Sequence, residues 1–405
     1  QQAWVSMPQA PPVTPKEAQL LKDMLAFYDQ FIGSTSDDTT LRVKRAEAQQ
    51  RVGKIQLLLG KTTLADSAYR RALETYQELH KEFPDNTTYP LQVITIKSDL
   101  GMLCRTNGQL LDSVTHHREA LEFLDELPKA IRQTPAARFR RARIYNLLGL
   151  PAQRGSRVET SDPGMAAQAL DNLLQEMGST RVDLYYQSKE ILNDLIRKYP
   201  KNPSYKIEKV RGLTNMMRVA NRPKTLPDPW IIWNDAKDII KQIQRDQPDN
   251  PVYEYELALL FVHKLQPGRQ QVPISRIRER LEEAITICNH LSQRYRHVPE
   301  YTRVLAQALY NRAEFELRTN KMRVEPDRLQ TATGLLRESI YYQQRLVSEF
   351  PDLLQYQIRL NQSSHRLSEA YERMGRIDDA QEILELTIKE LDNFLDAHPQ
   401  FEDAR

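Results

Sequence analysis

Hydrophobic residues recur along most of this chain at spacings of three and four residues, a pattern that predicts amphipathic α-helices rather than β-strands. The clearest case lies near the C-terminal end, where YQIRLNQSSHRLSEAYERMG (356–375) and DDAQEILELTIKELDNFLDAH (378–398) each predict one helix. Gly375 lies between them, and glycine is suited to the left-handed conformation that ends a helix and reverses the chain. The pattern therefore predicts pairs of antiparallel helices joined by short turns.

The same pattern returns at a nearly fixed interval. SDDTTL (36–41) is followed 48 residues later by PDNTTY (84–89), and Gly53 is followed by Gly101 at the same interval. With one insertion at 149–164 and another near 321–327, seven repeats can be aligned. Periods of about 20–50 residues are typical of solenoids, in which stacked repeats share a continuous core. The aligned first residues of the repeats are Leu41, Tyr89, Phe139, Tyr205, Tyr253, Tyr301 and Tyr356.

Three positions within the repeat support this alignment. The residue 31 positions after each first residue is always small, whereas the residues 28 and 38 positions after it are mostly large and apolar. Two antiparallel helices that approach closely leave room only for a small side chain at the crossing, so we expect the small residues there and the apolar ones in the core. The small residues are Ala72, Ala120, Ser188, Ala236, Ala284, Ser339 and Thr387.

These observations predict an all-α, superhelical solenoid over residues 16–405, with about seven antiparallel helix pairs and a period of about 48 residues. Residues 1–15 are proline-rich and aperiodic, so we expect a linker or arm, and 16–33 predicts a single helix that caps the solenoid. Residues 149–164 are expected to form a helix-rich insertion or a loop. Because the chain begins with Gln1 rather than Met, we expect it to be processed or part of a longer polypeptide.

The segment RVGKIQLLLG…LADSAYRRAL (51–73) resembles the tetratricopeptide repeat (TPR), because Gly53, Gly60, Ala65, Tyr69 and Ala72 stand at that family's spacings. Residues 100–121 and 367–388 match the same pattern, although the usual period of the family is about 34 residues. The resemblance implies a non-enzymatic solenoid whose first helices line a concave groove that holds a peptide or a helix of a partner protein.

A narrower resemblance rests on the proline-rich arm, LLKDMLAFYDQF, RVGKIQLLLG and AYRRALETYQELHKEFPDN. These phrases are similar to the repeat region of planctomycete serine/threonine protein kinases. That likeness implies a regulatory role in signalling and an extracytoplasmic location; without it, we expect the chain in the bacterial cytoplasm. The chain itself has no Gly-rich loop, His-Arg-Asp or Asp-Phe-Gly kinase signature.

The TPR resemblance also implies, by register, which residues face the groove. They are basic in the earlier repeats and acidic in the last two, so we expect a partner segment of complementary charge polarity, tested by Glu369→Lys with Glu372→Lys. The alternative is a solvated surface without a ligand. The predicted partner-binding residues are Glu47, Gln50, Lys54, Ser98, Arg105, Arg211, Arg218, Tyr310, Glu314, His365, Glu369 and Glu372.

Composition adds little chemistry to this picture. The net charge is only +3 over 405 residues, so we expect no nucleic acid partner, and no apolar run reaches the length of a membrane-spanning helix. RNA or a small ligand remains the alternative to a protein partner. The arginines at 138, 140, 141 and 143 are interleaved with other residues, as on a solvated helix face.

No residue pattern predicts an enzyme, a cofactor or a metal site. The chain has no Walker loop, dinucleotide fingerprint, nucleophile elbow or His-Glu-x-x-His. Adjacent helical residues such as His116 and His117 point about 100° apart, so we expect His117 to pack in the core rather than bind metal. Cys288 occupies an apolar register position and is expected to be a core residue, far from Cys104.

Overall fold

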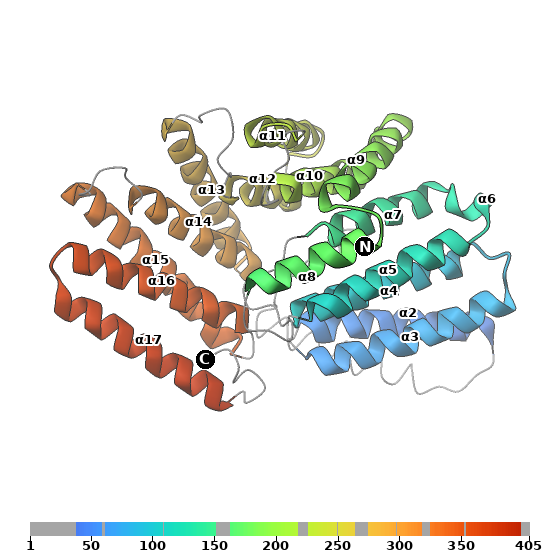
Figure 1. The fold of residues 1–405 in the computed structure, drawn as a ribbon, viewed down its shortest axis with the longest axis horizontal. Helices are drawn as coiled ribbons and strands as arrows, with labels where there is room; N and C mark the ends of the chain where they lie inside the picture. Colours follow the sequence, from blue (N-terminus) through green and yellow to red (C-terminus); the bar gives the residue numbers. More distant parts are fainter. Residues whose placement is uncertain are drawn as a thin grey trace. The chain divides into compact units, whose positions relative to one another are not determined.

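The computed structural model describes residues 38–58, 61–107, 109–150, 163–217, 226–248, 250–263, 274–296, 298–317, 325–351 and 354–397. Every regular element in these ranges is a helix, so the predicted all-α solenoid of helix pairs is confirmed (Figure 1). The chain divides into two compact units, an N-terminal unit that ends at Ile243 and a C-terminal unit that follows from Gln244. The predicted arm at 1–15 and capping helix at 16–33 lie outside the described residues.

The N-terminal unit contains α2 (Thr39–Leu58), α3 (Thr62–Glu82), α4 (Thr88–Thr106), α5 (Leu110–Glu126), α6 (Lys129–Arg132), α7 (Pro135–Leu148), α8 (Pro163–Glu176), α9 (Arg181–Lys198), α10 (Pro203–Met217) and most of α11 (Pro229–Asp246). Successive helices from α2 to α5 pack against one another, and α7 pairs with α9. The helix α8 follows the predicted insertion and packs on α5, outside the regular pairing.

The C-terminal unit contains α12 (Pro251–Val262), α13 (Ile274–Arg294), α14 (Pro299–Leu317), α15 (Pro326–Glu349), α16 (Leu354–Arg373) and α17 (Ile377–Ala397). Each of these helices packs against the next one along the chain. Gly375 has a positive φ of 75°, so the turn between α16 and α17 uses the left-handed conformation that the sequence predicts.

The aligned positions of the repeat have the predicted roles in packing. The small residues Ala72, Ala120, Ala236 and Ala284 are completely buried, and Thr387, in the last helix, is half-buried. The apolar residues at the 38th position are all buried, which places them in the core. They are Leu79, Leu127, Leu195, Ile243, Leu291, Leu346 and Phe394.

The third repeat has a different register from the predicted one. A Cβ atom added to Gly53 would lie 2.7 Å from the ring of Tyr69, and one added to Gly101 would lie 2.6 Å from the ring of His117. Gly149 stands in the same relation to Tyr185, at 2.5 Å, and the Tyr185 hydroxyl donates a hydrogen bond to the Gly149 carbonyl. Gly149, the first residue of the predicted insertion, is therefore the third member of the series of glycines 48 residues apart. The third repeat therefore aligns from position 137 rather than from Phe139.

Candidate partner-binding site

The first helices of successive repeats in the N-terminal unit are joined by polar contacts, and we call α2, α4, α7 and α10 the first-helix row. Gln50 on α2 donates a hydrogen bond to Asp99 on α4 at 3.3 Å. Asn146 on α7 donates a hydrogen bond to the Glu208 carboxylate on α10 at 2.8 Å. A Cβ atom at Gly212 would lie 2.6 Å from Asn146, so α10 and α7 approach closely there.

Asp99 brings together part of the predicted partner-binding site. The Nζ atom of Lys54 lies 3.7 Å from the same Asp99 oxygen that accepts from Gln50. Ser98, another predicted residue, directly precedes Asp99 on α4 and is buried. The sequence prediction missed Asp99 because it stands one position from Ser98, and neighbouring helical residues point about 100° apart.

The arginines of α7 divide into two pairs that differ in their partners. Thr134 caps the helix by accepting a hydrogen bond from the Ala137 N–H, which fixes where α7 begins. Arg138 pairs with Asp194 at 2.5 Å, and Arg141 pairs with Asp125 at 2.5 Å. Residues three apart share a helix face, so Arg140 and Arg143 form a second pair on another face.

Arg140 and Arg143 have no carboxylate partner among the described residues. The Arg140 Nε–H donates to the Thr95 hydroxyl on α4 at 2.8 Å, and its Nη1 donates to the Ala136 carbonyl at 3.2 Å. The Nε atom of Arg143 is buried without a hydrogen-bond partner. Burial, followed by the charge of Arg143, lowers the pKa of Arg140 to about 10, although Asp99 opposes this. Lys54 thus lies beside Asp99, and Arg140 is affected by the charges of both Arg143 and Asp99.

The other predicted residues of the N-terminal unit contribute less directly. Arg105 is buried on α4, and its charge acts on the fully buried His117 together with that of Arg143. Arg211 lies 3.7 Å from Glu208, so its charge is met within α10. Glu47 is exposed on α2, and Arg218 lies outside the described residues.

In the C-terminal unit, the predicted acidic residues are joined by an arginine that the sequence prediction missed. Arg366 on α16 binds both Glu314 on α14 and Glu369 on its own helix. His365 lies 3.7 Å from Glu369, whereas Glu372 is exposed. Tyr310 is half-buried, and burial followed by the Glu314 charge raises its pKa. The single charge of Arg366 is therefore shared by two of the three predicted glutamates of this unit, Glu314 and Glu369.

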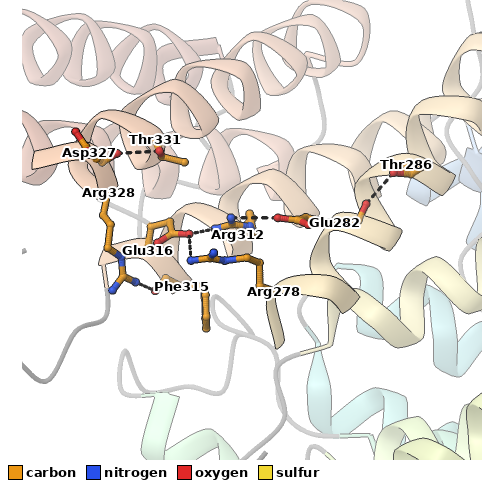
Figure 2. A network of polar contacts seen from close by, with 9 residues as sticks. All are labelled: Arg278, Glu282, Thr286, Arg312, Phe315, Glu316, Asp327, Arg328 and Thr331. Carbon is orange, nitrogen blue, oxygen red and sulfur yellow. Dashed lines mark hydrogen bonds and ion pairs between the residues drawn. The ribbon is translucent and has the colours of Figure 1, made fainter. Parts of the chain in front are cut away.

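A second network in this unit surrounds the buried carboxylate of Glu316 (Figure 2). Arg312 binds it from the same helix, Arg328 of α15 lies 2.7 Å away, and Arg278 of α13 lies 3.3 Å away. Burial acts to raise the pKa of Glu316, but hydrogen bonds from Arg312 and Arg328 outweigh it and lower the pKa. The guanidinium of Arg312 also reaches Glu282 on α13, at 3.3 Å. This network ties three helices together by setting three arginines around the carboxylates of Glu316 and Glu282.

The histidine and cysteine residues behave as core residues. His117 is 1% exposed, and burial lowers its pKa to about 3, which confirms its predicted place in the core. Cys288 is completely buried in the C-terminal unit, and Cys104 is buried in the N-terminal unit. Within the described ranges, no three His, Cys, Asp or Glu side chains are grouped to hold a metal ion. No helix in those ranges is long and apolar enough to cross a bilayer.

No protein-family model and no curated protein matches this sequence. Solved structures that resemble the fold include a thermophilic TPR protein of Thermus thermophilus, with a TM-score of 0.35, 14% identity, and coverage of 67% of this chain and 98% of that one. The apo quorum sensor NprR from B. thuringiensis has a TM-score of 0.36 and 12% identity, with coverage of 93% and 99%. A human IFIT1 dimer with m7Gppp-AAAA has a TM-score of 0.32 and 10% identity, with coverage of 93% and 73%. The narrower resemblance to kinase repeat regions stays a prediction.

Proposed function

We propose that this chain is a non-enzymatic protein-interaction scaffold, and that the first-helix row of the N-terminal unit binds an acidic segment of a partner protein. The observation that supports the proposal is the pair Arg140 and Arg143, two adjacent cations on one helix face without a carboxylate partner among the described residues. Holding like charges together in a partly buried position is unfavourable, and such arrangements are concentrated at functional sites.

The chemistry of the row suits carboxylates of a peptide. Arginine binds carboxylates through paired hydrogen bonds, and the Asp99 carboxylate is already engaged by Lys54 and Gln50. Glu or Asp side chains of a partner would supply the charge that Arg140 and Arg143 lack.

A protein partner is favoured over RNA by the size of the positive charge. Proteins that bind RNA neutralise many phosphates and stack bases on aromatic side chains. Here two arginines, Arg140 and Arg143, have no carboxylate partner among the described residues, and the net charge of the whole chain is only +3. If the chain binds RNA instead, its affinity for RNA should fall steeply as the salt concentration rises.

The test compares two double variants of the same helix. Arg140→Gln with Arg143→Gln removes the two unpaired charges, and Arg138→Gln with Arg141→Gln removes the same number of charges from the face that pairs with Asp194 and Asp125. Binding of a labelled Glu-rich peptide, and of its counterpart with Gln for Glu, is measured by fluorescence anisotropy. We expect the first variant to weaken binding by about 2 kcal/mol, or roughly thirtyfold, and the second to change it little.

Equal losses in the two variants would overturn the assignment, because binding would then follow net charge rather than this face. Equal affinity for the two peptides would also overturn it. Capture from fractions of the native cells, with the same two variants as baits, then identifies the partner as the protein that the Arg140/Arg143 variant loses.

A finer part of the proposal is that this chain is the non-catalytic region of a bacterial serine/threonine kinase. Its support is the sequence resemblance to planctomycete kinase repeat regions. An antibody against this chain should then detect a polypeptide in the native cells that is larger than 47.2 kDa by about 30 kDa or more, the size of a kinase domain. Detection of a polypeptide without a kinase domain would rule out the kinase part of the proposal and leave the acidic-segment proposal unaffected.

A further inference from the structure

A cavity of about 510 Å³ lies in the N-terminal unit between the start of α3, the end of α4 and the start of α5. This volume lies within the range of about 300–1,000 Å³ that small-molecule sites occupy. The pocket opens to solvent, and most of its lining residues are polar: threonines, side-chain amides, two carboxylates, a guanidinium and an imidazole, together with Leu103 and Cys104. Such a wall suits a polar ligand, because each buried apolar group of a ligand would displace water from polar partners.

The charges around the cavity leave one carboxylate without a cation. Arg70 pairs with Asp66 at 2.7 Å, so these two lining residues neutralise each other. Asp112 accepts a hydrogen bond from the Gln109 amide at 3.3 Å and forms no ion pair with a described residue. Its position in the first turn of α5 gives it a modest stabilisation by the helix dipole. The wall therefore carries one net negative charge at neutral pH, located on Asp112.

Two further groups in the wall are buried and uncharged at neutral pH. Cys104 is 8% exposed, and burial, followed by the charges of Asp112 and Asp66, raises the pKa of its thiol to about 11. The Nδ1 atom of His116 is buried without a hydrogen-bond partner, and its nearest carboxylate oxygen, on Glu119, lies 3.9 Å away. Burial is the main cause that lowers the pKa of His116. The uncharged thiol and imidazole add no charge to the wall, so its net charge stays negative.

We propose that this cavity is a binding site for a small organic amine that also carries hydroxyl or amide groups. The ammonium group would pair with Asp112, and the hydroxyl or amide groups would bond to the threonines and to the side-chain amides of Asn107 and Gln109 that line the pocket. This site involves none of the arginines of the first-helix row that carry the proposed function. The two proposals can therefore fail separately.

The test uses three probes of equal length that differ at one end: aminobutanol, butanediol and hydroxybutyrate, which end in an ammonium, a hydroxyl and a carboxylate. Calorimetric titration of the full chain is expected to detect binding of aminobutanol and no comparable binding of the other two. Asp112→Asn is expected to weaken aminobutanol binding at least tenfold. Glu122→Gln, a charge removed from the same helix beside Arg118 and outside the cavity, is the matched control and should leave binding unchanged.

Alkylation of Cys104 locates the bound amine. The chain has two cysteines, and Cys288 is completely buried, so slow modification of the native protein by iodoacetamide reports on Cys104. Aminobutanol should slow this modification in the wild type and in Glu122→Gln but not in Asp112→Asn, whose helical content is checked by circular dichroism. The proposal is overturned if butanediol protects as well as aminobutanol does, if Asp112→Asn keeps full affinity, or if no amine protects Cys104.

Discussion

The buried imidazole of His117 gives the most direct test of how the repeats pack. In the equivalent positions of the first and third repeats, Tyr69 and Tyr185 lie against Gly53 and Gly149 as His117 lies against Gly101. Both ring nitrogens of His117 are buried without hydrogen-bond partners. Replacing His117 by tyrosine therefore introduces the residue that this position holds in the neighbouring repeats, and it removes a group that is costly to bury.

The expected effect depends on pH in a defined direction. The folded-state pKa of His117, about 3, lies below the unfolded value of about 6.5. Between these values the unfolded chain binds one more proton, so the stability that neutral His117 contributes is complete above about pH 6.5 and is lost as the pH falls toward 3. The slope is about 1.4 kcal/mol per pH unit, which amounts to about 2 kcal/mol between pH 6.5 and 5. Removal of two unsatisfied nitrogens adds about 1–3 kcal/mol at neutral pH.

The assay is chemical denaturation of wild type and His117→Tyr, followed by circular dichroism at several pH values between about 5 and 7. The difference between the two midpoints should widen as the pH falls, because only the wild type carries the linked titration. His365→Gln, at an exposed histidine, is the control and should follow the wild type. A difference that is independent of pH, or imidazole NMR signals of His117 that titrate near pH 6, would refute the account of a neutral buried ring.

Four further substitutions test the packing. Glu316→Gln leaves Arg312 without its buried carboxylate, so we expect a loss of about 3 kcal/mol in the free energy of unfolding, measured by chemical denaturation. Gly149→Ala should destabilise by about 1–3 kcal/mol because the new methyl group meets the Tyr185 ring. Gly334→Ala, in the interior of α15 with open space around it, should stabilise by about 0.5–1 kcal/mol, and the opposite order of the two melting temperatures would contradict the packing. Ala284→Leu should overpack a helix crossing at about 1–3 kcal/mol, seen as a lower melting temperature.

The fold could be predicted because one packing arrangement is repeated in the sequence. A small residue at each helix crossing and an apolar residue seven positions later recur in every repeat, so errors at single positions are averaged out. The register of the third repeat was wrong because Phe139 matches the aromatic first residues of other repeats, whereas the residue that occupies this place in the structure is Ala137. Ala137 is completely buried, and aromatic character was a misleading guide there.

The candidate site was less predictable, because it depends on which side chains meet across helices. Register selects one face of each helix, but long side chains cross to neighbouring helices, as Lys54 does when it reaches Asp99. Arg366 stands next to the predicted His365 and binds two of the predicted acids, Glu314 and Glu369. Glu369→Lys would therefore break its contact with Arg366, which makes Glu372→Lys alone the cleaner test of an acidic surface.

The contact between a glycine and a ring, repeated at Gly53, Gly101 and Gly149, bears on how such a chain can change in length during evolution. A tandem duplication or deletion of 48 residues that begins and ends within the first two repeats keeps the register of the glycine and the ring at its single new junction. The junction need not coincide with a turn, because the residues on either side of it hold equivalent positions of the repeat. The third repeat departs from this rule, because Tyr185 stands 36 residues after Gly149 instead of 16. Gene duplication can therefore lengthen the first two repeats by whole units without disturbing the contact between glycine and ring.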